Sequence, residues 1–174
     1  KTILLHMWEK AKDFIVKAFT IIFVATIVIW ILQTFDFKFN IVEDSGDSML
    51  AAIGSFIAPV FAPLGFGDWR ASTALITGLT AKETVVATLA VLSGTSTDAA
   101  LSASLQGMFT PLTAFSFLVF TLLYMPCVAA MAAIRRELRS TSQALLLMLF
   151  QTTVAWIVAF VLYHIVGLVI RLVA

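Results

Sequence analysis

Two adjacent charged residues, Lys82 and Glu83, lie midway along a stretch that otherwise suits the interior of a membrane, residues 72–92. A charged side chain at the centre of a bilayer costs about 2.5–3.5 kcal/mol on insertion scales. We therefore expect both side chains to face other helices, a cavity or the membrane interface rather than lipid. Charges in such positions usually mark an ion path, a coupling site or an essential packing contact.

Threonines recur around this pair at helical spacing, at Thr73, Thr77, Thr80, Thr84 and Thr88. On one continuous helix they would fall within about 80° of each other, and Glu83 would lie about 100° from the middle of this stripe. A carboxylate near hydroxyl groups suits a hard or borderline divalent cation, so Glu83 is a candidate metal ligand. Lys82, Thr80 and Thr84 are candidates for a coupling role.

The same residues also have a structural interpretation. Small hydroxyl residues commonly hold membrane helices together, and Lys82 would then pair with a backbone carbonyl or a distant acid. Neighbouring residues of one helix do not face each other. Lys82 and Glu83 are therefore expected to have different partners.

A second group of interest is the run Tyr124-Met125-Pro126-Cys127. Pro126 interrupts the apolar stretch 112–134 and has no N–H to donate to the carbonyl four residues back, so the sequence predicts that the carbonyl oxygen of Leu122 is left free. A thiol next to such an oxygen suits transient binding of a borderline metal such as Fe(II), which makes Cys127 a candidate ligand. The alternative is that Cys127 packs as a small apolar side chain.

The composition is that of an integral membrane protein. Hydrophobic residues make up 61% of the 174 residues and charged residues 12%, whereas soluble domains carry about 25% charged residues. The net charge of +1 gives no indication of nucleic acid as a partner. One cysteine excludes an intrachain disulfide and a cysteine-only metal cage. Neither the G-x-x-x-x-G-K-[ST] nor the H-E-x-x-H motif occurs.

Apolar stretches of about 20 residues predict the membrane spans. We expect an all-α, polytopic transmembrane bundle whose spans are 14–32, 49–66, 72–92, 112–134 and 142–173. Pro59 and Pro63 interrupt the second span, which is predicted to be a broken or re-entrant segment forming a mobile hairpin. The polar residues 93–107 are predicted to form a loop, with room for one short helix.

The positive charges predict the orientation of these spans. Lys10, Lys12 and Lys17 precede the first span, while Arg135, Arg136 and Arg139 follow the fourth. Both groups lie on the cytoplasmic side by the positive-inside rule if four crossings separate them. That count gives five passes with the C-terminus outside, and it fails if 49–66 only dips into the membrane.

Three collinear runs resemble the C-terminal membrane half of bacterial ferrous iron transport protein B (FeoB). They are Ala58–Arg70 (APVFAPLGFGDWR), Ala81–Val86 (AKETVV) and Tyr124–Glu137 (YMPCVAAMAAIRRE). The opening HMWEKAKDFIVKAFTII is also similar to the family's entry into this half. The resemblance covers nearly the whole chain, and three collinear motifs are far more specific than any one of them.

The resemblance implies an inner-membrane, multi-pass protein that moves Fe(II) inward. Proteins of this family carry a cytoplasmic G domain, where GTP and Mg would bind, ahead of a helical region with two Gate motifs. Cys127 falls on the proline-cysteine motif of the second Gate, and Glu83 falls in the alanine-lysine-glutamate motif. The family picture places both termini of the whole protein inside, which conflicts with five passes. A re-entrant segment at 49–66 or 93–112 would resolve the conflict.

The sequence is therefore interpreted as a membrane fragment of a ferrous iron transporter and not as an enzyme. The chain starts without Met, so we expect a piece of a longer protein, with the G domain and the first Gate outside it. Expected partners are the lipid bilayer, the N-terminal half of the protein, a second copy and small accessory proteins of iron uptake. The alternatives are a non-transporting scaffold or oligomerisation segment, and an intramembrane enzyme, for which Cys127 and the distant His164 are a poor catalytic set.

Overall fold

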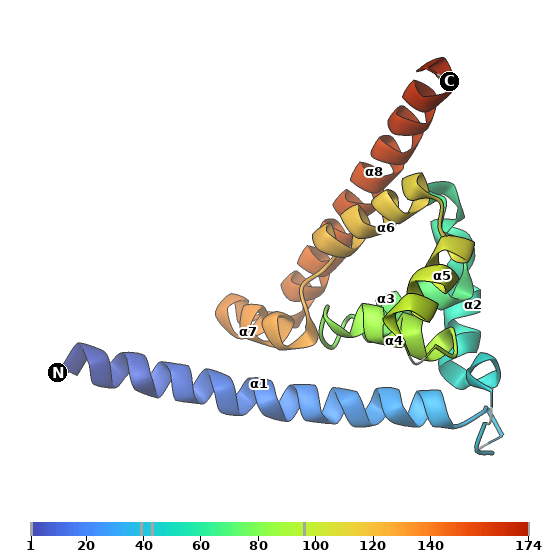
Figure 1. The fold of residues 1–174 in the computed structure, drawn as a ribbon. Coiled ribbons are helices and arrows are strands. Elements are labelled where there is room, and N and C mark those ends of the chain that lie inside the picture. Colours follow the sequence, from blue (N-terminus) through green and yellow to red (C-terminus); the bar gives the residue numbers. More distant parts are fainter. Residues whose placement is uncertain (1, 39, 43, 96, 174) are drawn as a thin grey trace.

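The computed structural model describes residues 2–38, 40–42, 44–95 and 97–173, and their regular structure is helical apart from an isolated bridge between Phe35 and Ile41. The predicted all-α fold is confirmed (Figure 1). In chain order the elements are α1 (Thr2–Thr34), η1 (Ser45–Asp47), α2 (Met49–Phe61), η2 (Ala62–Leu64), α3 (Trp69–Thr77), α4 (Thr84–Leu92), α5 (Asp98–Met108), α6 (Pro111–Leu123), α7 (Val128–Leu138) and α8 (Thr141–Val173).

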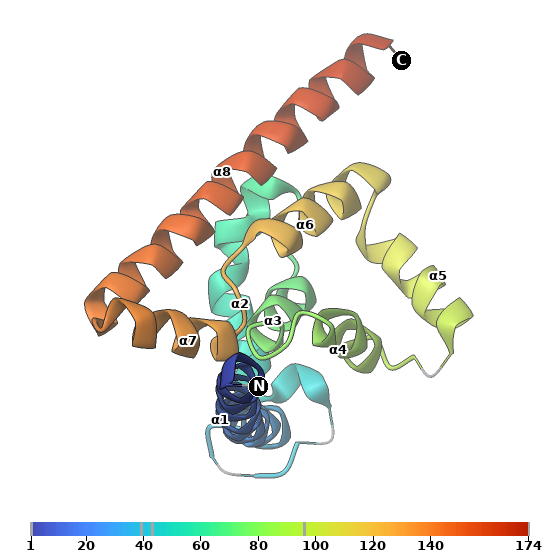
Figure 2. The same cartoon turned by 90° about the vertical axis from the view of Figure 1, so that its left-hand side faces the viewer.

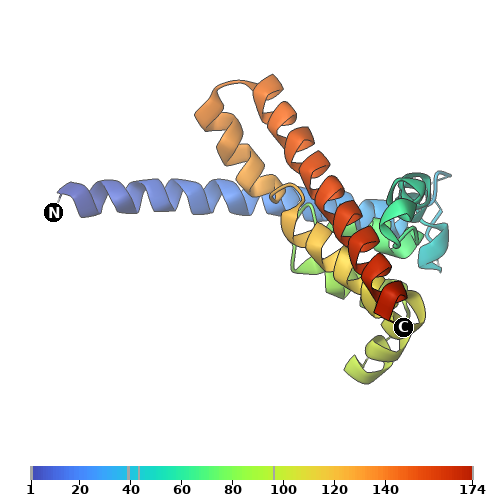
Figure 3. The ribbon, with the colours of Figure 1, turned by 90° about the horizontal axis from the view of Figure 1, so that it is seen from above.

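The two longest helices, α1 and α8, lie at the edges of the bundle. Helix α1 contacts α7 and α2, and its N-terminal half extends away from the other helices (Figure 3). Helix α8 runs along α6. Large apolar side chains of α1 such as Trp8, Phe19 and Phe23 are exposed in this chain. Such surfaces need a cover of lipid or further protein.

Helix α2 and helix α3 form a sharp bend. The hydroxyl of Ser48 caps α2 by accepting from the N–H of Ala51, and α2 continues past Pro59 to Phe61. The short η2 turn ends at Gly65, whose φ of 89° is a left-handed conformation that glycine adopts without strain. The bend between the two arms is 106°, so the break predicted within 49–66 is present as a broken span or a re-entrant loop.

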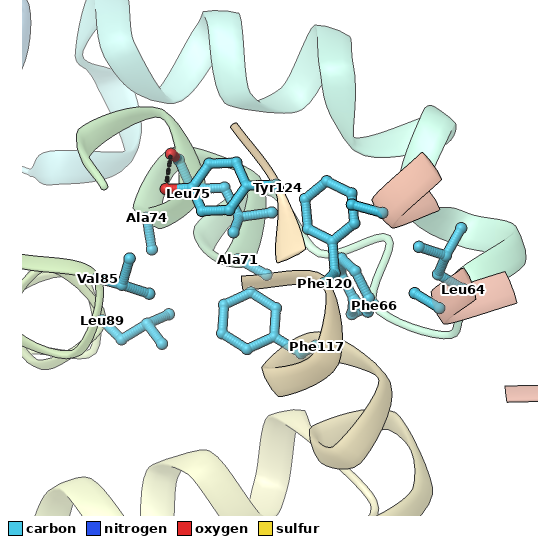
Figure 4. Packing of buried hydrophobic residues seen from close by; sticks show 12 residues of the cluster. Leu64, Phe66, Ala71, Ala74, Leu75, Val85, Leu89, Phe117, Phe120 and Tyr124 are labelled. Carbon is cyan, nitrogen blue, oxygen red and sulfur yellow. Dashed lines mark hydrogen bonds between the residues drawn. The ribbon is translucent and has the colours of Figure 1, made fainter. Parts of the chain in front are cut away.

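The apolar core lies inside this bend and is rich in aromatic rings (Figure 4). Phe120 of α6 meets Phe61 of α2 edge-on at 5.2 Å between ring centroids, and Phe117 meets Phe66 at the same distance. Buried residues of α3, α4 and α8 complete the cluster. The core thus fixes α6 against the α2–α3 bend and against the short helices α3 and α4.

Two described segments are long and apolar enough to cross a membrane, namely α6 with α7 (Pro111–Leu138) and α8 (Thr141–Leu172). The bent α2–α3 pair adds a third if it counts as one span, and Phe19–Thr34 is a shorter apolar helix. The structure thus has a membrane-type helical bundle. The predicted five crossings and their orientation stay predictions.

Two predicted spans are not continuous helices. Residues 72–92 divide into α3 and α4, and residues 112–134 divide into α6 and α7. The polar segment 93–107, predicted as a loop with room for a short helix, contains most of α5, whose start is capped by the Thr97 hydroxyl. The two breaks, at residues 78–83 and 124–127, form the candidate site.

Candidate functional site at two facing helix breaks

The first break, residues 78–83, begins at a glycine and is lined by threonine hydroxyls that bond to nearby carbonyls. The Thr80 hydroxyl donates to the carbonyl of Thr77 over 2.7 Å, and the Thr84 hydroxyl donates to that of Ala81 over 2.8 Å. Side chain to backbone bonds of this kind compete with helical bonds. Together with Gly78, a poor helix former, they weaken the helix between the end of α3 at Thr77 and the start of α4 at Thr84.

This break corrects the predicted threonine stripe. The one-face arrangement and the 100° angle to Glu83 assumed an unbroken helix, so both are wrong. Instead the chain folds back, and the hydroxyl oxygens of Thr77 and Thr88 lie 2.8 Å apart in a buried hydrogen bond between α3 and α4. Thr73 lies elsewhere, buried against Gly54 of α2. Thr73, Thr77 and Thr88 thus hold helices together, as in the structural alternative. Thr80 and Thr84 lie at the break itself, and their coupling role stays a prediction.

The second break, residues 124–127, lies between α6 and α7 and contains Pro126. The N–H of Tyr124 still donates to the carbonyl of Phe120 over 2.8 Å, and helical bonding then stops. Helix α7 begins at Val128, directly after Cys127. The break occurs where the missing proline donor predicts it.

The two breaks lie against each other (Figure 2). The N–H of Val128 donates to the carbonyl of Leu79 over 2.8 Å, which joins the backbones of the two breaks. The Tyr124 hydroxyl donates to the carbonyl of Leu75 at 3.4 Å (Figure 4). A Cβ added to Gly78 would lie 2.6 Å from this hydroxyl oxygen, so only glycine permits the approach. Each break therefore supplies partners for backbone groups that the other leaves open.

Lys82 crosses from the first break to the second. Its Nζ donates to the carbonyl oxygen of Leu122 over 3.1 Å and to that of Tyr124 over 3.2 Å. The same ammonium lies 4.9 Å from the centre of the Tyr124 ring, within the range of a cation–π contact. The carbonyl of Leu122, predicted to be free, has lost its helical donor as expected but accepts from Lys82. Of the alternatives for Lys82, the structure has the backbone carbonyl rather than the distant acid.

Glu83 and Cys127 are placed differently. Glu83 directly precedes α4, is exposed, and makes no side-chain capping bond. Cys127 is half-buried and directly precedes α7. Within the described residues, no three His, Cys, Asp or Glu side chains gather closely enough to hold a metal ion. Direct metal binding by Glu83 or Cys127 stays a prediction.

Several contacts at or near this site were not predicted from the sequence. They are the Thr77–Thr88 bond, the Val128–Leu79 backbone bond, and the bond from the indole N–H of Trp156 in α8 to the carbonyl of Val60 at 3.0 Å. Thr77 and Thr88 are 11 positions apart in the sequence. The residues joined by the bonds of Val128 and Trp156 are much farther apart. The one local signal was Gly78, because an isolated glycine weakens a helical pattern.

Comparisons with known proteins support the resemblance seen in the sequence. The sequence profile of the Gate family, described as nucleoside recognition, matches residues 15–141. The chain is 40% identical over 165 residues to a protein of Staphylococcus aureus (strain MSSA476) named Fe(2+) transporter FeoB. The aligned region covers 95% of this chain and 24% of that protein. A protein of the same name from Methanocaldococcus jannaschii is 36% identical over 167 residues, or 92% of this chain and 25% of the relative.

A protein of Porphyromonas gingivalis, named as a fusion of Fe(2+) transport protein A with Fe(2+) transporter FeoB, is 30% identical over 95% of this chain and 25% of its own length. The chain thus spans about a quarter of the length of these curated relatives. No solved structure matches it.

Proposed function

The chain belongs to the Gate family and is similar to the C-terminal region of FeoB proteins, and on this premise we propose that it forms part of the path by which Fe(II) crosses the membrane. The similarity covers nearly the whole chain. The helices are of membrane type. The proposal therefore depends on what the two facing breaks can do for a cation.

One observation carries the proposal: four helix ends meet where the two breaks face each other, and their backbone groups lack helical partners and are paired across the breaks instead. Transporters commonly place substrate and ion sites at discontinuous helices, where unwound carbonyls and helix ends contact the ion. Cys127 adds a thiol, a soft ligand that suits Fe(II). A path also needs ligands weak enough to release the ion, which a thiol with backbone oxygens provides.

The exposed position of Glu83 suggests where the path runs. Its carboxylate lies at the surface of this chain, directly before α4, a helix composed mostly of apolar residues. A carboxylate at membrane depth is too costly to leave in lipid. We propose that Glu83 faces the part of the protein outside this chain, so that Fe(II) passes between the two Gate-containing halves with Glu83 on one side and Cys127 nearby.

The wider setting extends the same proposal. The segment itself catalyses no reaction and acts in a bacterial inner membrane, joined to a G domain that binds GTP and Mg and whose hydrolysis of GTP is coupled to transport. The small accessory proteins of iron uptake and a second copy are the expected partners. The name of the fusion protein, which contains Fe(2+) transport protein A, supports such an association.

A scaffold function without transport is the second candidate. The Thr77–Thr88 bond and the Val128–Leu79 bond favour it, because polar groups that bond to each other between helices are not available to an ion. In a pure scaffold, replacing Cys127 by a residue of the same shape would leave transport unchanged.

The test is uptake of radioactive Fe(II) by full-length protein in proteoliposomes. We expect Cys127→Ser to lower uptake by about tenfold, equivalent to about 1.4 kcal/mol, while GTP hydrolysis and expression stay at the level of the unaltered protein. Ser116→Ala is the matched control, because Ser116 of α6 is buried and its hydroxyl has no partner among the described residues. Unchanged uptake by Cys127→Ser would remove Cys127 from the path and favour the scaffold.

A further inference from the structure

Lys82 binds two backbone carbonyl oxygens, those of Leu122 and Tyr124, that have no helical donor. Pro126 removes the helical donor to the carbonyl of Leu122, and the chain turns away before a donor reaches that of Tyr124. Both oxygens lie at the C-terminal end of α6, where the helix dipole gives a partial negative charge. The only donor that the described residues bring to both oxygens is the ammonium of Lys82, at 3.1 and 3.2 Å.

These groups together have the composition of a cation site. Backbone carbonyl oxygens are ligands for metal cations, and channels use them in place of the hydration shell. The face of an aromatic ring attracts cations as well, and the Tyr124 ring lies 4.9 Å from the Lys82 ammonium. A compact charge on a flexible stem, as lysine has, can leave such a site without moving its backbone.

We propose that the carbonyl oxygens of Leu122 and Tyr124, with the ring of Tyr124, form a cation site in which Lys82 is a resident ammonium, and that a transported divalent cation enters by displacing it. The inference rests on the proposed function and adds to it a residue that competes with the ion. A divalent ion interacts about twice as strongly as an ammonium with the same oxygens. The displaced ammonium stays tethered nearby and repels the ion, which favours release.

Displacement of the Lys82 ammonium also removes a contact between two helices. In the structure Lys82 joins the break before α4 to the end of α6. With the ammonium gone, this link is lost, while the backbone bond from Val128 to Leu79 remains. Occupancy of the site by an ion is thus coupled to the freedom of α4 relative to α6.

The first experiment uses the unaltered full-length protein in lipid nanodiscs. Lysines are acylated with an amine reagent, with and without Fe(II) kept reduced or the redox-stable probe Mn(II), and each lysine is followed by peptide mass spectrometry. We expect the modification rate of Lys82 to rise severalfold, and to saturate, as the metal displaces its ammonium into solvent. Lys38, exposed in the loop after α1, is the internal control and keeps its rate. An unchanged or slower rate at Lys82 would overturn the inference.

The second experiment separates charge from packing. Lys82→Met keeps a long side chain and removes the competing charge, so Mn(II) binding measured by equilibrium dialysis should tighten by about tenfold, or about 1.4 kcal/mol. Lys82→Arg keeps a cation and should bind no tighter than the unaltered protein. Equal or weaker binding by folded Lys82→Met would show a purely structural lysine. If that variant does not fold, the labelling of the unaltered protein decides the matter.

The two proposals fail in different ways. Absence of Fe(II) uptake by the unaltered protein in proteoliposomes would overturn the proposed function, and labelling of Lys82 that still responds to metal would leave the cation site standing. Normal uptake with an unresponsive Lys82 would leave the transport function standing and overturn the cation site.

Discussion

The continuous helix α8 and the interrupted pairs α3–α4 and α6–α7 treat their backbone polar groups in opposite ways. Helix α8 runs unbroken for 33 residues and exposes apolar side chains such as Leu146 and Leu168. In the interrupted pairs, some carbonyls at the breaks have no helical donor. They accept hydrogen bonds from the other break instead, as the carbonyl of Leu79 does from the N–H of Val128. Helices of the first kind can face lipid, because all their inner backbone bonds are made within the helix.

Interrupted backbone at membrane depth is tolerated only where protein or a water-filled cavity covers it. The comparison therefore separates the surfaces of this chain into two kinds. The long helices provide apolar area for lipid or for further helices, and the facing breaks provide the polar groups that a cation can use.

The largest effect is expected where the breaks come closest. Gly78→Ala places a Cβ 2.5 Å from a methyl of Val85 and 2.6 Å from the Tyr124 hydroxyl, so we expect a loss of about 3 kcal/mol, the upper end of the usual cost of overpacking. Thermal unfolding in detergent measures it. Gly107→Ala is the matched control, because open space surrounds Gly107. Equal melting temperatures of the Gly78 variant and the unaltered protein would show that the breaks are not closely packed.

A smaller effect is expected at the buried hydroxyl pair. Thr77→Val leaves the hydroxyl of Thr88 without its partner, and we expect a loss of about 2 kcal/mol. The double variant with Thr88→Val should cost less than the sum of the two single changes, with a coupling energy of about 1 kcal/mol. Simple additivity in the same unfolding assay would mean that the two threonines do not hold α3 against α4.

The smallest effect on stability is expected at Glu83. Its side chain makes no bond among the described residues, so Glu83→Gln should change the unfolding free energy by at most about 0.5 kcal/mol. Fe(II) uptake should nevertheless fall, with a changed dependence on Fe(II) concentration. If Glu83 instead pairs with a buried cation elsewhere in the full-length protein, removing the charge should cost about 3–5 kcal/mol. A large loss of melting temperature with proportionally lost protein would remove its role as an ion contact.

The sequence predicted the parts of this arrangement that depend on local chemistry. Pro126 identified the second break and the carbonyl of Leu122 as an acceptor without a helical donor. The first break was missed because residues 78–83 contain no proline and their neighbours have helical spacing. It is held by contacts from Tyr124 and Val128, more than 40 positions away. The periodicity of residues 72–92 does not reveal these long-range contacts. The predicted stripe of threonines was therefore wrong, because it assumed an unbroken helix.

The most direct test of the account is whether Fe(II) reaches the second break. In full-length protein in nanodiscs, the rate at which a small thiol reagent alkylates Cys127 is measured by peptide mass spectrometry with and without Fe(II). Cys127 is half-buried and is the last residue of the break, and an ion bound there would occupy the sulfur. We expect Fe(II) to slow the alkylation of Cys127 in a saturable manner, whereas Na⁺ at the same ionic strength does not. A rate at Cys127 that is the same at every Fe(II) concentration would contradict the central claim that the facing breaks lie on the path of the ion.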